Sequence, residues 1–186
     1  MGNSHKQILL DGFKTYGERS GVAQYMGEKK LNLGCGSCPE PVWNGWDNAD
    51  INPRTAATLI FDMRDIEWPI EWQTYDTVLA NMVLQHFSGK CLFRVMKNIN
   101  EALKPGGYLV AEVPYGMTGS PLQESFWNEA TPMYFCKHIY FDHEMSTTCE
   151  DQLMPLADWE VPLVAQRQGE DGFIKSIHFV MRKPLG

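Results

Sequence analysis

Short apolar runs between residues 30 and 113 constrain the fold of this chain most strongly. Each is too short for a helix and apolar on both faces, as is typical of strands buried in a parallel sheet. A helical pattern interrupts them at residues 92–103, where apolar side chains share one face until Lys104-Pro105-Gly106-Gly107 ends the helix. The runs read KLNL, WDNADI, TLIFDM and YDTVLAN before this helix and YLVAEV after it. Together they predict an α/β fold with a mostly parallel sheet.

The 186 residues fit a single domain, whose parts are distinguished by their patterns. An amphipathic helix within residues 1–28 reads as a lid or docking helix, and residues 29–114 hold the parallel strands. Residues 115–158 show no strand period, although Asp142 could cap a helix there, and we expect this segment to cover the site. Residues 159–186 predict two strands joined by a polar, glycine-containing turn, hence a β-hairpin at one sheet edge.

Composition narrows the possible partners and the compartment. The net charge is −7 and the basic residues are scattered, which disfavours binding to duplex nucleic acid. Neither a run of 18 apolar residues nor a signal peptide is visible, so we expect no membrane association and a cytoplasmic location. Five cysteines, an odd number, argue against a disulfide framework and are expected to be reduced thiols.

Residues able to bind a ligand follow the predicted strands at their carboxyl ends, where open α/β sheets hold their ligands. The first strand ends in Gly34-Cys35-Gly36, whose missing side chains allow close approach of a ligand to the backbone. Asp50 ends the second strand, and its carboxylate can accept two hydrogen bonds from a ribose diol. Asp62 ends the third strand and could face an adenine edge, and Asn81 ends the fourth.

Two other ligands fit this glycine turn less well. A nicotinamide dinucleotide needs a third glycine and a helix N-terminus, whereas Pro39 stands there and only nine residues separate Gly36 from Trp46. The CxxC of Cys35 and Cys38 could suggest zinc or redox chemistry. Structural zinc needs four ligands, and a second close pair is absent. The redox motif opens a long helix that proline forbids. We therefore expect neither NAD nor a metal.

Several motifs together resemble those of the class I S-adenosylmethionine-dependent methyltransferases. They are LNLGCG, GWDNADIN, FDMRDIEWP, YDTVLANMVLQHF and NINEALKPGGYLVAEVP, within roughly residues 30–114. The resemblance is closest to a compact subgroup in which a shortened first crossover leads to a G-W-x-N-x-D-I strand. It implies a Rossmann-like, seven-stranded, mostly parallel sheet with the last strand antiparallel and helices on both faces. It also implies S-adenosylmethionine as the cofactor.

The same resemblance implies roles for particular strand-end residues. Gly34, Cys35 and Gly36 would pass under the methionine moiety, whose far end Asn81 and Met82 would line. Asp50 would hold the ribose hydroxyls. Ile51 would lie against the adenine face, and Asp62 and Met63 would meet the adenine edge. His86 matches the usual histidine of the family after the fourth strand. Together with His138 of the covering segment, it is a candidate for proton transfer.

The implied activity is methyl transfer by in-line displacement, for which a protein mainly positions donor and acceptor. Methyltransferases that modify exocyclic amines usually carry a motif like N/D-P-P-Y/F after the fourth strand. This chain has NMVL at that place, which disfavours base methylation. The expected acceptor is therefore a small molecule or a sugar, as is common among relatives of this compact type. A protein that binds S-adenosylmethionine without turnover, as a partner subunit, is the alternative.

Overall fold

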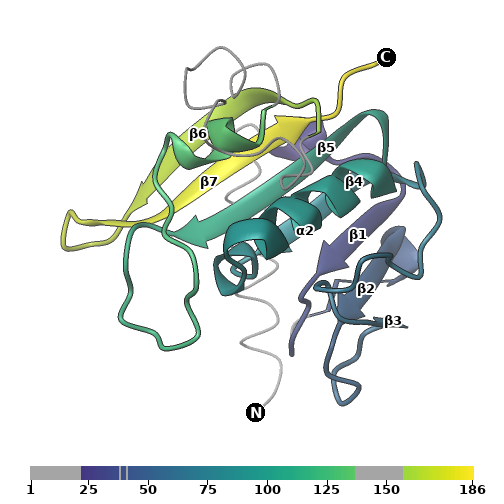
Figure 1. Ribbon diagram of the computed structural model, residues 1–186, viewed down its shortest axis with the longest axis horizontal. Helices are drawn as coiled ribbons and strands as arrows, with labels where there is room; N and C mark the ends of the chain where they lie inside the picture. Colours follow the sequence, from purple (N-terminus) through teal and green to yellow (C-terminus); the bar gives the residue numbers. More distant parts are fainter. Residues whose placement is uncertain (1–21, 38, 41, 137–156) are drawn as a thin grey trace.

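The computed structural model describes residues 22–37, 39–40, 42–136 and 157–186 as one sheet with helices packed on it (Figure 1). The predicted N-terminal helix before residue 22, the helix capped by Asp142 and the candidate base His138 lie outside these residues. The strands are β1 (Lys30–Leu33), β2 (Trp46–Asp50), β3 (Leu59–Ile60), β4 (Tyr75–Asn81), β5 (Leu103–Pro114), β6 (Glu160–Gln168) and β7 (Ile174–Arg182).

The seven strands lie in the order β3-β2-β1-β4-β5-β7-β6. Strands β1 to β5 pair in parallel, whereas β7 runs antiparallel to both β5 and β6. This confirms the predicted Rossmann-like α/β sheet and its C-terminal hairpin. The strand order reverses between β1 and β4, so the crevice expected to hold a ligand opens where these two strands end.

Asparagine side chains explain how the first crossover can be so short. Among the described residues between β1 and β2, the one helical element is η2, a single 3-10 turn at Val42–Asn44. Asn48, fully buried in β2, fastens the chain that leads to it. Its Oδ1 accepts from the Glu40 amide at 2.7 Å, and its Nδ2 donates to the Glu40 carbonyl at 2.8 Å. Buried Asn32 of β1 donates to the same Oδ1 at 3.0 Å. These side-chain bonds satisfy the backbone that a helix would otherwise satisfy.

The two faces of the sheet have separate apolar cores. Helix α2 (Gly89–Ala102) covers one face, as Figure 1 shows, and buries Val95 and Ile99 completely. On the other face, the 3-10 turn η1 (Val22–Tyr25) joins a smaller cluster that includes Val22, Leu79 and Val110. The strands are therefore buried from both sides, as the continuous apolar runs predicted.

Two strand boundaries differ from the sequence reading. Only Leu59 and Ile60 of TLIFDM pair with β2, because the chain turns at Asp62, whose carbonyl accepts from the Asp65 amide at 3.0 Å. In contrast, β5 begins directly after α2 at Leu103, so residues 104–107 belong to the strand instead of forming a separate stop. The glycines there pair with the chain after β7: Gly106 N donates to the carbonyl of Lys183 at 2.9 Å.

The segment after β5 packs on the α2 side of the sheet. Trp127 is 1% exposed, and its ring stacks on Phe179 of β7 with centroids 5.4 Å apart. The 3-10 turn η4 (Thr131–Phe135) follows, and Phe135 packs on Trp127. Residues 115–136, which we call the covering segment, thus follow β5 and pack beside β7, while coverage of a site by residues 115–158 stays a prediction. None of the helices in the described part of the chain has the length and apolarity to cross a membrane.

Asp76 lies at the end of β4 opposite the crevice and offers a test of stability alone. Its carboxylate accepts from Lys104 Nζ at 2.7 Å and from the Lys29 amide at 2.8 Å. Partial burial raises the pKa of this carboxyl, but the bonds from Lys104 and Lys29 and the Lys104 charge outweigh burial, so its pKa lies below the ordinary value.

We expect Asp76→Asn to lower the free energy of unfolding at pH 7 by about 1 kcal/mol, because it removes the charge from these hydrogen bonds. The folded pKa is depressed, so the contribution is present above the unfolded pKa of about 4 and disappears as pH falls through the folded value. Urea denaturation of both proteins between pH 7 and pH 3 should show the two stabilities converging. A constant difference would show that the charge of Asp76 is irrelevant.

Candidate functional site

The turn after β1 has the backbone that the glycines predicted. Gly34 and Gly36 have φ values of +64° and +51°, which side chains rarely allow. A Cβ on Gly34 would lie 2.6 Å from Val83 Cγ2, so this glycine is required by packing within the protein. A Cβ on Gly36 would meet nothing within 4 Å. Between them, Cys35 is buried, and its amide donates to the Ala49 carbonyl of β2 at 3.1 Å. The turn is therefore fixed to the sheet and open at Gly36.

Asp50 lies beside this turn and is bonded to it. Its Oδ2 accepts from the Gly36 amide at 2.8 Å, and its Oδ1 accepts from the Asn52 amide at 2.8 Å. A carboxylate offers about four lone-pair sites, so each oxygen can accept a further hydrogen bond. The sheet thus brings the two predicted features, glycine turn and carboxylate, into direct contact. Next to Asp50, Ile51 is 52% exposed, a large apolar side chain left open at the crevice.

The residues after β3 form a turn closed on itself. Asp62 Oδ1 accepts from the Arg64 amide at 2.9 Å, and Oδ2 lies 3.4 Å from Arg64 Nη1. Met63 is buried, its Cε would be 3.7 Å from a Cβ on Gly34, and its carbonyl accepts from Trp68 Nε1 at 3.1 Å. Met63 therefore reaches the glycine turn, whereas the Asp62 carboxylate is engaged by its own turn.

A strained residue and an unpaired acceptor stand at the end of β4. Asn81 is exposed as the last residue of the strand, and Met82 after it has φ +54° with its side chain 45% exposed. Positive φ in a non-glycine residue is uncommon and concentrates at functional sites. The Gln85 amide donates to the Met82 carbonyl at 2.7 Å. The side-chain oxygen of Gln85, Oε1, is buried and has no hydrogen-bond partner in the described structure. Leaving this oxygen unpaired costs about 1–3 kcal/mol of stability unless a ligand donates to it.

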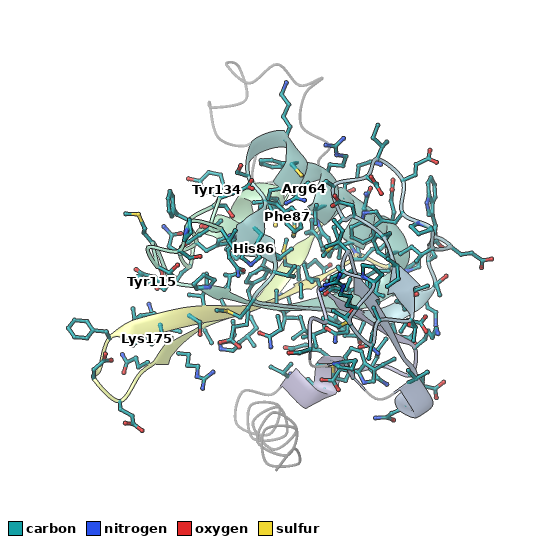
Figure 2. The ribbon with its side chains drawn as sticks, turned by 90° about the horizontal axis from the view of Figure 1, so that it is seen from below. Arg64, His86, Phe87, Tyr115, Tyr134 and Lys175 are labelled. Atoms are coloured by element: carbon teal, nitrogen blue, oxygen red, sulfur yellow. The ribbon has the colours of Figure 1, made fainter. Side chains whose placement is uncertain are left out.

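His86 connects the 3-10 turn η3 (Leu84–His86) to the covering segment. Its Nδ1 lies 2.7 Å from the Leu122 carbonyl, and its Nε2 lies 3.2 Å from Gln85 Nε2. With Gln85 as donor, Nε2 accepts and Nδ1 carries the proton that is donated to Leu122. Figure 2 labels His86 and its chain neighbour Phe87, and the Arg64 guanidinium lies 5.7 Å from the Phe87 ring centre. Both ring nitrogens are thus engaged within the protein, which favours positioning over proton transfer.

We expect His86→Ala to lower stability by about 1–2 kcal/mol, because the Leu122 carbonyl and the Gln85 amide each lose a partner. Cofactor affinity should fall with it, since Gln85 and Met82 at the end of β4 are then less well held. His86→Asn is the matched control, because an amide nitrogen can replace Nδ1 as the donor to Leu122. Urea denaturation and calorimetry with S-adenosylhomocysteine measure both effects. Equal stability of His86→Ala and the parent protein would contradict this role.

The structure also gathers polar residues that the sequence analysis missed. Glu112 of β5 meets Ser176 and His178 of β7, with Glu112 Oε1 at 2.7 Å from Ser176 Oγ and 3.1 Å from His178 Nε2. Burial raises the pKa of the Glu112 carboxyl, but these bonds, the His178 interaction and the nearby Arg167 charge outweigh it, so its pKa lies below the ordinary value. The signal was present in the sequence: IKSIHFV places Ser and His two residues apart, on one face of an apolar strand.

Comparisons with known proteins agree with this architecture. Residues 31–111 match the family model of a methyltransferase domain. No curated protein sequence matches the chain. A methyltransferase dependent on S-adenosylmethionine from Archaeoglobus fulgidus has a similar structure, with 13% identity over 93% of this chain and 94% of the other, and a TM-score of 0.60. One from Methanosarcina mazei has 13% identity over 89% of this chain and 97% of the other, with a TM-score of 0.52.

A third similar structure is TehB from Haemophilus influenzae, with 18% identity and a TM-score of 0.57. The similar region spans 90% of this chain and 62% of TehB. At these identities the solved structures are informative about the fold, and the family match concerns the strands that carry the glycine turn, Asp50 and Asn81.

Proposed function

We propose that this chain is a class I S-adenosylmethionine-dependent methyltransferase and that it transfers the methyl group to a small molecule or a sugar. The observation that carries the proposal is the bonded pair of Gly36 and Asp50 at the ends of adjacent strands, beside the point where the strand order reverses. An open glycine turn and a fixed carboxylate at this point suit a nucleoside ligand without a pyrophosphate.

The described residues fit S-adenosylmethionine at each end of the crevice. We propose that Gly34, Cys35 and Gly36 pass under its methionine moiety, because the space beside Gly36 is open. Asp50 would accept from both ribose hydroxyls with the lone pairs that the Gly36 and Asn52 amides leave available. Exposed Ile51 would lie against one adenine face.

The remaining roles concern the adenine edge and the methionine end. We propose that the Met63 backbone and the Asp62 carboxylate meet the adenine edge, the latter with the lone pairs that Arg64 leaves open. Asn81 and Met82 would line the methionine end. The unpaired Gln85 oxygen beside Met82 supports a ligand with a hydrogen-bond donor there.

The chemistry asks mainly for positioning. S-adenosylmethionine supplies a methyl group that its sulfonium charge makes electrophilic. The protein must hold the acceptor in line with that group at near-attack distance, which contributes several kcal/mol. The glycine turn and Asp50 are fixed to the sheet by hydrogen bonds and can orient one partner. The covering segment, anchored by Trp127 and by the bond of Leu122 to His86, can exclude water on the α2 side of the crevice.

Proton removal is needed only for acceptors whose proton is retained at neutral pH. We propose His138 of the covering segment as the base for such an acceptor, with His86 in a supporting position. Both ring nitrogens of His86 contact protein groups, Gln85 and Leu122, which agrees with a supporting role for His86.

Charge and sequence favour a small acceptor over duplex nucleic acid. The chain carries a net charge of −7, and NMVL, which begins at Asn81 at the end of β4, stands where base-modifying enzymes have their proline motif. We further propose one domain over residues 1–186 and a cytoplasmic location. Cys91 and Cys136 are free thiols, which supports a reducing compartment.

A screen for the acceptor tests this proposal. The protein would be incubated with S-adenosylmethionine and pools of small alcohols, amines and sugars, with transfer RNA, duplex DNA and a protein mixture as the competing classes. S-adenosylhomocysteine formation would be measured by mass spectrometry. We expect formation only with a small-molecule pool. Formation that depends on nucleic acid or protein would overturn the acceptor class, and none with any pool would favour a partner subunit that binds without turnover.

A further inference from the structure

Four polar side chains from three strands gather on the face of the sheet opposite α2. They are Glu112 of β5, Arg167 of β6, and Ser176 and His178 of β7. Ser176 and His178 are 4% and 5% exposed, whereas the Arg167 side chain is 64% exposed, so the cluster is buried at β7 and reaches the surface at β6. Buried polar groups of this kind cost free energy unless they are paired, and each has a function or a structural partner that explains it.

Three side chains of this cluster contact one oxygen of Glu112, and two of them, Ser176 Oγ and His178 Nε2, also lie 3.5 Å from each other. Oε1 accepts from Ser176 Oγ at 2.7 Å, lies 3.1 Å from His178 Nε2, and lies 3.5 Å from Arg167 Nη1. Within the described parts of the chain, Oε2 has no hydrogen-bond partner, and the side chain remains 19% exposed. Among the described residues, the carboxylate is therefore held through Oε1, and Oε2 retains lone pairs for a further hydrogen bond.

Strand register places this carboxylate beside the proposed methionine end. Asn81 of β4 is directly opposite Glu112, which is directly opposite His178. One residue earlier, Ala80 pairs with both Ala111 and Leu33, the last residue before the glycine turn. Neighbouring strands are about 4.8 Å apart, so Glu112 lies two strands, roughly 10 Å, from the level of that turn.

Alternation of side chains puts the same row on one face. One row across the sheet contains Ala49, Ala80, Ala111 and Phe179. The next row towards the crevice contains Asp50, Asn81, Glu112 and, because β7 is antiparallel, His178. Side chains at equivalent positions of paired strands share a face. A line of polar groups thus runs from the proposed ribose carboxylate, past the methionine end, to Glu112.

We propose that Glu112 binds the methyl acceptor through Oε2 and selects acceptors that present an amino or hydroxyl group. This inference rests on the proposed function, because it assigns the space beyond Asn81 to the second substrate. A fixed carboxylate accepts hydrogen bonds and attracts a cation, and a ligand without a donor would leave it unpaired. Ser176 and His178 act as positioning residues, since they hold Oε1 and so aim Oε2.

The test compares Glu112→Gln with Glu160→Gln. Glu160 of β6 pairs with Arg182 at 3.2 Å near the other end of the hairpin, so its variant removes the same charge away from the site. Each protein would first be titrated with S-adenosylhomocysteine by calorimetry. The saturated proteins would then be screened by ligand-observed NMR against small primary amines and alcohols, each paired with its methyl-capped analogue.

We expect all three proteins to bind S-adenosylhomocysteine with affinities within about twofold. The parent and Glu160→Gln should bind donor-bearing members of the panel, and Glu112→Gln should bind them about tenfold to a hundredfold more weakly. Glu112→Asp retains the charge but withdraws it by one methylene, and should also lose this binding. It serves as the second variant if Glu112→Gln fails to fold.

Other results would overturn the inference in distinguishable ways. Loss of S-adenosylhomocysteine affinity in Glu112→Gln alone would assign Glu112 to the cofactor pocket. Unchanged amine and alcohol binding would make the cluster structural, as would equal binding of the capped analogues. If the saturated parent bound no donor-bearing compound, the acceptor role would fail by itself. If the parent bound no S-adenosylhomocysteine, the proposed function would fail, and this inference with it.

Discussion

Asp50→Ala should weaken S-adenosylmethionine binding by about tenfold to a hundredfold, or roughly 1.5–3 kcal/mol. The substitution removes the oxygens proposed for both ribose hydroxyls. It also releases the Gly36 amide, whose 2.8 Å bond to Oδ2 holds the glycine turn against β2. Both effects act on the ligand, whereas the fold should survive, because Asp50 is a strand-end residue outside the apolar cores. Isothermal calorimetry and thermal denaturation would measure the two quantities.

Asp47→Ala is the matched control, because it removes a carboxylate from the same strand. Asp47 accepts from Tyr75 Oη at 2.9 Å and pairs with Lys29 at 2.7 Å, near the amino ends of β2 and β4 and thus away from the carboxyl ends that line the crevice. It should cost some stability but leave cofactor affinity within about twofold. Unchanged binding by Asp50→Ala would move the ribose contact to another residue.

The two glycines of the turn should respond to alanine in opposite ways. Gly34→Ala places a Cβ 2.6 Å from Val83 Cγ2 at a φ of +64°, so overpacking and backbone strain should together cost about 2–4 kcal/mol of stability. Gly36→Ala meets nothing within 4 Å. Its φ of +51° should therefore cost only about 1–2 kcal/mol in the protein alone.

Ligand affinity separates the two substitutions further. If the methionine moiety passes under Gly36, the methyl group of Gly36→Ala intrudes on it, and S-adenosylmethionine affinity should fall at least tenfold in a protein that remains folded. Urea denaturation gives the stabilities, and calorimetry on the folded variants gives the affinities. Full affinity in Gly36→Ala would show that the ligand does not approach this backbone.

The parallel strands and their hairpin were predictable because their signals are local. YDTVLAN corresponds to β4 residue for residue, and the apolar face of residues 92–103 gives α2. The short first crossover also followed from the prolines after Gly36. In contrast, the truncation of β3 depends on a turn at Asp62. The early start of β5 depends on pairing of Leu103 with Tyr75 and of Gly106 with Lys183. Such distant pairings leave no period in the local sequence.

The site was predictable where a residue type is required by its position. Glycines at positive φ and a carboxylate at a strand end are recognisable alone, and the bond between Gly36 and Asp50 agrees with that reading. The Glu112 cluster joins residues 64 positions apart, and strand order alone brings them together. Asn48 escaped notice for the same reason, since its role depends on where the crossover chain returns to β2.

Titration with two cofactors tests the central claim most directly. Isothermal calorimetry should show S-adenosylmethionine binding with a micromolar dissociation constant, about −8 kcal/mol, and no heat of binding with NAD. Mass spectrometry of the native protein would add whether S-adenosylmethionine or its demethylated product is retained. Binding of NAD without binding of S-adenosylmethionine would contradict the assignment of the glycine turn and of Asp50.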